Sequence, residues 1–101
     1  MFWMIYITNP DRATAARIGK HLVEKRIAAC CCTFRITDSI CIWKGKMTTA
    51  GEWAVIVKTA KPDAVEKEVK KIHPYEVPCI IRWKVSANAD YEKWLTSTVR
   101  R

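Results

Sequence analysis

The stretch Ile40-Cys41-Ile42-Trp43-Lys44-Gly45-Lys46-Met47-Thr48-Thr49-Ala50-Gly51-Glu52-Trp53-Ala54-Val55 decides the fold, because it joins two strand-like segments with no helix between them. Its two ends are apolar, as in strands, whereas residues 44–51 contain two glycines and several polar side chains, as in turns. We therefore predict a long β-hairpin whose turn lies in residues 44–51. The first strand of the hairpin should begin near Ala28, since residues 28–34 form a small, apolar run.

One strand and one helix are predicted before the hairpin. Residues 1–8 are rich in β-branched and aromatic side chains, which favours a strand. Asn9 is expected to cap a helix that runs to about Lys25, with Pro10 at its first position. Apolar residues recur in this segment at helical spacing and predict one buried face. They are Ala15, Ile18, Leu22 and Val23.

A second helix and a last strand are predicted after the hairpin. Residues 62–72 begin with proline and carry acidic side chains early, as helices do. Residues 79–85 alternate apolar and polar side chains, and a short helix capped by Asn88 or Asp90 follows. This order predicts an α+β fold, a ferredoxin-like βαββαβ sandwich with a long β-hairpin and a C-terminal helix. Such a fold hosts many functions and decides none.

Composition sets the class of protein. The 101 residues, half of them hydrophobic, predict a single domain, residues 1–101, with a buried core. No stretch reaches the roughly 20 apolar residues of a membrane helix, so no membrane partner is expected. Residues 1–7 lack the basic start of a signal peptide. Five cysteines without a CxxC pair indicate free thiols, and we expect a cytoplasmic protein.

The net charge of +8 permits a nucleic-acid partner. RNA-recognition domains share the predicted strand order and stack bases on aromatic side chains, a role open to Tyr6 and Trp53. The glycine-rich aromatic motif of those domains is absent, however, and the basic residues are scattered along the chain. Nucleic acid is therefore not the expected partner.

The segment His73-Pro74-Tyr75-Glu76-Val77-Pro78 places an imidazole, a phenol and a carboxylate on a loop between two prolines. Each proline fixes its own φ and restricts the preceding residue, which stiffens the loop. His73 and Glu76 would bind a divalent cation, for which the Irving–Williams order favours copper. The alternative interpretation is purely structural, with the loop hydrogen-bonded to a neighbouring element or subunit.

The row Cys30-Cys31-Cys32 offers a second metal hypothesis. In a strand, Cys30 and Cys32 share a face and Cys31 points away, so two thiols would hold a soft ion such as copper(I). Packing of these cysteines in the core is the alternative that we prefer. No nucleophile–base order, phosphate loop or metalloprotease motif occurs in the chain, so we expect no enzyme activity.

Six motifs in order resemble the CutA divalent-cation tolerance family along nearly the whole chain. They are Thr8-Asn9-Pro10-Asp11, Arg26-Ile27-Ala28-Ala29-Cys30, Trp43-Lys44-Gly45-Lys46, Glu52 with Lys58-Thr59, His73-Pro74-Tyr75-Glu76-Val77-Pro78 and Tyr91-Glu92-Lys93-Trp94-Leu95. The resemblance implies a ferredoxin-like subunit in a homotrimer, with sheet edges paired between subunits. It also implies a non-enzymatic role linked to copper and other divalent cations.

The resemblance further suggests a ligand pocket between subunits. Its candidate residues are Trp43, Lys44, Lys58, Tyr75, Tyr91 and Trp94. The chain departs from the family pattern at four positions, Ile7, Cys32, Lys44 and Ile72. Ile7 and Ile72 stand where some members carry potential metal ligands, so weak metal binding is expected. An alternative function is that of a PII-like signalling trimer, which would hold an anionic small molecule between subunits. Lys44, Lys46, Lys58 and Arg82 would then line the cleft.

Overall fold

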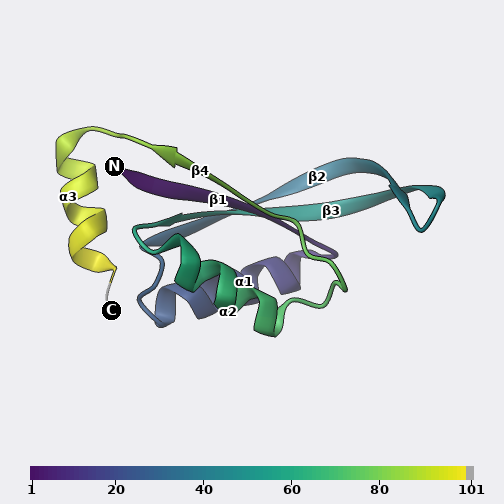
Figure 1. The fold of residues 1–101 in the computed structure, drawn as a ribbon, viewed down its shortest axis with the longest axis horizontal. Coiled ribbons are helices and arrows are strands. Elements are labelled where there is room, and N and C mark those ends of the chain that lie inside the picture. Colours follow the sequence, from purple (N-terminus) through teal and green to yellow (C-terminus); the bar gives the residue numbers. More distant parts are fainter. Residues whose placement is uncertain (100–101) are drawn as a thin grey trace.

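The computed structural model describes residues 1–99 and has the predicted α+β, ferredoxin-like architecture (Figure 1). Its elements are β1 (Phe2–Asn9), α1 (Arg12–Glu24), β2 (Cys30–Trp43), β3 (Lys46–Thr59), α2 (Pro62–Ile72), β4 (Ile80–Val85) and α3 (Ala89–Thr98). The four strands form one antiparallel sheet in the order β2-β3-β1-β4. Within residues 1–99, no helix is long and apolar enough to cross a membrane.

The sheet is covered on one face only. Helices α1 and α2 lie side by side against that face, and α3 lies at the end of the sheet near the N-terminus (Figure 1). The hairpin of β2 and β3 extends beyond the helices and gives the chain a longest dimension of 45 Å. Within residues 1–99, the opposite face, which we call the uncovered face, carries no helix except α3, which packs on its end beside Phe2.

The core lies between the sheet and the two helices, because every second strand residue points to them. Strands β1 and β3 contribute Ile5, Ile7, Val55 and Val57, all fully buried. Each fully buried aliphatic side chain of this size contributes about 1.5–3 kcal/mol to folding. The helices contribute their predicted apolar faces, Ala15, Ile18 and Leu22 from α1 with Val65 and Val69 from α2. A smaller cluster of Phe2, Ala29 and Leu95 holds α3.

The predicted cap of α1 was wrong. Asp11 is the N-cap, and its Oδ1 accepts a hydrogen bond from the amide of Thr14 at 2.7 Å. Asn9 still belongs to β1, where it is buried and its Nδ2 donates to the carbonyl oxygen of Trp53 at 3.0 Å. A cross-strand partner thus holds the asparagine in the sheet, and the helix begins two residues later than the sequence suggested.

The turn of the hairpin is also shorter than predicted. Only Lys44 and Gly45 lie outside the strands, and their φ angles are +51° and +79°. Two positive φ angles are typical of the tight type I′ turn, whose twist matches that of the strands. Trp43 consequently pairs with Lys46, and residues 46–51 are strand rather than turn. Glycine at the second turn position allows this geometry.

Candidate functional site

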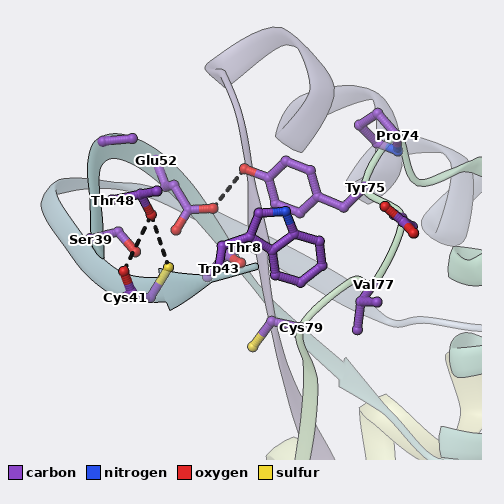
Figure 2. Close-up of a pocket in the computed structure, with 12 residues that line it drawn as sticks. Thr8, Ser39, Cys41, Trp43, Thr48, Glu52, Pro74, Tyr75, Val77 and Cys79 are labelled. Atoms are coloured by element: carbon purple, nitrogen blue, oxygen red, sulfur yellow. Dashed lines mark hydrogen bonds between the residues drawn. The ribbon is translucent and has the colours of Figure 1, made fainter. Parts of the chain in front are cut away.

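A cavity of about 610 Å³ opens on the uncovered face, at the base of the hairpin (Figure 2). Thr8 of β1 and Glu52 of β3 lie at its floor. The hairpin supplies one wall, and the loop between α2 and β4 supplies the other. The cavity therefore combines the motif-rich loop with strand residues that are distant in the sequence.

A β-bulge in β2 determines which hairpin side chains line this cavity. Ile36 pairs with Glu52, and Ser39 pairs with Ala50, so β2 takes three steps where β3 takes two. The extra residue reverses the alternation of side chains along the rest of β2. As a result Cys41 and Trp43 face the cavity. The side chains of the opposite hairpin face, Ile40, Ile42 and Met47, are 65%, 70% and 73% exposed.

The loop after α2 is held in place by three hydrogen bonds. The hydroxyl of Tyr75 donates to Oε2 of Glu52 at 2.6 Å (Figure 2). Nε2 of His73 lies 2.8 Å from the carbonyl oxygen of Thr8 and must be the donor, because a carbonyl only accepts. The amide of Tyr75 donates to Nδ1 of His73 at 3.1 Å. Contacts with β1 and β3 thus support the structural interpretation of this loop.

This geometry weakens the metal hypothesis for His73 and Glu76. Both ring nitrogens of His73 are already hydrogen-bonded, and burial lowers the pKa of the imidazole. A metal would have to displace one of these backbone partners. The side chain of Glu76 is 71% exposed and lies 3.6 Å from the ammonium of Lys44, outside the bonds that hold the loop. The ring of His73 is thus engaged by the backbone, whereas the carboxylate of Glu76 is exposed to solvent.

The three consecutive cysteines divide between the two faces of the sheet. Cys31 packs against the core beneath α1, where a Cβ added to Gly19 would lie 3.1 Å from its own Cβ. Burial raises the pKa of this thiol to about 12. Cys30 is half-buried and Cys32 is exposed, on the opposite face. Core packing is therefore correct for Cys31 and wrong for Cys30 and Cys32.

The six predicted pocket residues form two groups within one chain. Trp43 and Tyr75 line the cavity, and Lys44 lies at its rim. At the other end of β3, the ammonium of Lys58 lies 5.4 Å from the ring centroid of Tyr91, which packs on Trp94 at 5.5 Å. Six residues of strand, about 20 Å, separate Glu52 from Lys58. A single pocket containing all six would need a second subunit.

The second group includes a candidate metal ligand. Sγ of Cys30 lies 3.5 Å from the hydroxyl of Tyr91. The pKa of Lys58 is raised, chiefly by the hydrogen bond of its ammonium group to Tyr91 and further by the nearby thiols of Cys30 and Cys32. The positive charge of the Lys58 ammonium opposes the binding of a metal cation at Cys30 and Cys32.

The predicted anion-binding cleft does not contain Arg82. This side chain does not join Lys58, because it pairs with Asp63 at 2.8 Å and with Glu66 at 2.6 Å beside α2.

Nine of the twelve cavity residues were absent from the predicted site, and three of these nine carry an ionisable side chain. Glu52 appeared only as part of a family motif, and Cys41 and Cys79 were not singled out as ligands of this site. Cys79 immediately follows Pro78, the last residue of the loop motif, and this is the one sequence signal that could have placed it near the cavity. Among residues 1–99, no three His, Cys, Asp or Glu side chains are grouped so as to hold a metal ion.

Comparison with known proteins agrees with this fold and these motifs. Residues 3–98 match the family described as CutA1 divalent ion tolerance protein. The chain belongs to the CutA1 family. A divalent-cation tolerance protein CutA of Archaeoglobus fulgidus is 42% identical, over 94% of this chain and 95% of that protein. Its counterpart in Thermotoga maritima is 38% identical, over 95% of this chain and 97% of that protein.

Solved structures of CutA1 proteins share the whole fold. The Archaeoglobus fulgidus structure has a TM-score of 0.94 at 41% identity and covers 99% of this chain and 100% of its own. The Pyrococcus horikoshii structure has a TM-score of 0.92 at 32% identity and covers 98% and 99%. The resemblance of the six motifs to this family is thus confirmed.

Proposed function

We propose that this CutA1-family chain is a non-enzymatic homotrimer that binds a divalent cation, with copper as the leading candidate. Relatives named for divalent-cation tolerance support a role with metals. The observation that carries the proposal is the position of the thiols. Of the five cysteines, four lie on the uncovered face: Cys30, Cys32, Cys41 and Cys79.

The uncovered face supports assembly because it is apolar and accessible. Phe34, Ile81 and Trp83 are 44%, 53% and 40% exposed there. They surround Ile56 and Tyr6, which are neighbours in the ladders of β3 and β1. Free strand edges at β2 and β4 add unpaired backbone groups. Packing around a three-fold axis would bury both kinds of surface.

Assembly also bears on the metal. Within residues 1–99 of one chain, no three potential ligands are grouped, whereas a trimer repeats each thiol three times. Soft thiolates select copper(I), so copper taken up as the divalent ion would be held at these thiols in its reduced, monovalent form in a reducing compartment. The imidazole of His73 contributes in this proposal only if it gives up its bond to Thr8. We therefore expect the cation to bind between subunits through sulfur.

A copper titration of the reduced trimer with a competing chromophoric chelator tests the proposal. Two double variants, Cys30→Ser with Cys32→Ser and Cys41→Ser with Cys79→Ser, separate the two ends of the uncovered face. Cys31→Ala is the matched control, since its thiol faces the helices. We expect one double variant to lose copper binding and the control to keep it. Equal binding by all three variants would contradict a thiol site.

We also propose that the protein acts in the cytoplasm. Free thiols without a disulfide fit a reducing compartment. The Archaeoglobus fulgidus relative, by contrast, is described as periplasmic. Fractionation of cells that express the untagged chain decides the matter. Recovery with periplasmic markers would contradict the proposal.

A further inference from the structure

The cavity at the base of the hairpin has a charge opposite to that of the protein. The chain carries a net charge of +8, yet among residues 1–99 the cavity is lined by two carboxylates, Glu52 and Glu76, and by no lysine, arginine or histidine. Glu76 stands at the exposed rim and is paired with Lys44 at 3.6 Å. Among residues 1–99, no basic side chain lies within ion-pair distance of Glu52. The interior of the cavity is therefore negative.

The other polar groups inside the cavity do not offset this charge. Burial, together with the hydrogen bond to Glu52, raises the pKa of Tyr75 well above its usual range. Burial likewise raises the pKa of Cys79. Both groups are neutral at physiological pH. Within the described part of the chain, the one hydrogen bond that the Glu52 carboxylate accepts comes from Tyr75 and engages Oε2, which leaves Oε1 available to a donor.

Aromatic side chains complete the cavity. Trp43 and Tyr75 both line the cavity, and the Tyr75 hydroxyl points to Glu52 (Figure 2). The ammonium of Lys44 lies 5.9 Å from the centroid of the Trp43 ring, so this ring already accepts a cation from the rim. A volume of about 610 Å³ suits a small organic molecule. Aromatic faces attract organic ammonium groups, and a carboxylate that lines the same cavity adds a charge-assisted hydrogen bond.

We propose that this cavity binds a small organic cation, whose ammonium group pairs with Glu52 while its carbon chain lies against Trp43 and Tyr75. A metal ion fits the cavity less well, because three ligands do not converge anywhere in residues 1–99. An anionic ligand is opposed by Glu52. The cavity also contains Cys41 and Cys79, one of the two thiol pairs proposed above for copper, but the binding of an organic cation by Glu52 does not require these thiols.

Calorimetry on the assembled, reduced protein in the presence of a metal chelator tests the proposal. The probes are n-butylammonium, butyrate and 1-butanol, which share a chain length and differ in charge. We expect n-butylammonium to bind about tenfold more tightly than the neutral alcohol and butyrate not to bind. Similar affinity for all three probes, or no binding of n-butylammonium, would overturn the proposal. The chelator removes any contribution from copper, so the two proposals fail separately.

Variants locate the binding. Glu52→Gln and Trp43→Leu should each weaken n-butylammonium binding about tenfold. Glu24→Gln, on the exposed end of α1, is the matched control and should bind like wild type. Tyr75→Phe keeps the carboxylate but removes its hydrogen bond, and should bind at least as well as Glu24→Gln. Wild-type affinity in Glu52→Gln would overturn the proposal even if that variant is less stable.

Discussion

The hydroxyl of Tyr75 donates a 2.6 Å hydrogen bond to the carboxylate of Glu52. This bond joins the loop between α2 and β4 to β3 and forms the inner wall of the cavity (Figure 2). The tyrosine is therefore a structural support of the loop and also part of the proposed binding site. The carboxylate has the same two roles.

Removal of this hydroxyl should destabilise the protein measurably. Tyr75→Phe should lower the free energy of unfolding by about 1 kcal/mol, because Glu52 loses its partner. Tyr75→Ala should lower it by about 3 kcal/mol, since packing against His73 is lost as well. Denaturant unfolding of both variants gives these values. In the background of Glu52→Gln the Tyr75→Phe effect should shrink, and an unchanged effect would show that the bond is not the cause.

The assembly should be a trimer in solution. Light scattering at micromolar concentration should give about three times the subunit mass of 11.7 kDa. Ile81→Lys places a charge on the uncovered face and should shift the mass toward that of one subunit. Lys20→Glu, on the exposed side of α1, serves as the control and should stay trimeric. A monomer mass for the wild type would disprove the prediction.

Acid should weaken the contact between α1 and α2. Glu68 bonds to His21 at 2.8 Å and to Lys25 at 3.1 Å, and lies 3.7 Å from Lys71. These partners, the hydrogen bond from His21 first, lower the pKa of Glu68 from 4.5 to about 2. Between these values the unfolded chain binds more protons, so stability falls as pH drops from about 4.5 to 2.

Thermal unfolding across this acidic range measures the effect. Glu68→Gln should flatten the decline in melting temperature between pH 4.5 and 2. Glu24→Gln should leave the decline unchanged, because this exposed carboxylate has no ion pair within residues 1–99. Parallel curves for wild type and Glu68→Gln would show that the cluster does not govern acid stability.

The imidazole of His73 should be neutral, with its proton on Nε2. Protonation of Nδ1 would break the hydrogen bond from the amide of Tyr75, and burial lowers the pKa of this ring below 6.5. Its contribution to stability should be present above pH 6.5 and decrease as pH falls through the lowered value. Nitrogen-detected NMR of labelled histidine resolves the tautomer and its titration. A proton on Nδ1 at neutral pH, or titration at the ordinary value, would contradict this assignment.

Local patterns in the sequence were sufficient for the order and type of the elements. The buried faces of α1 and α2 follow directly from the spacing of residues such as Ile18 and Val65, because helical geometry repeats over a few residues. Lys44-Gly45 is likewise a local hairpin signal. Local reasoning was wrong at Asn9, because its partner Trp53 is 44 residues away.

The sequence by itself determined the fold class, the motif-rich loop and membership of the CutA1 family. Only the tertiary structure decided which side chains meet. The bulge between Ile36 and Ser39 turns Cys41 and Trp43 toward the cavity, while Cys30 and Cys32, before the bulge, lie at the other end of β2. The physical reason is that the face of a strand residue depends on its register with a partner strand, and one extra residue reverses it.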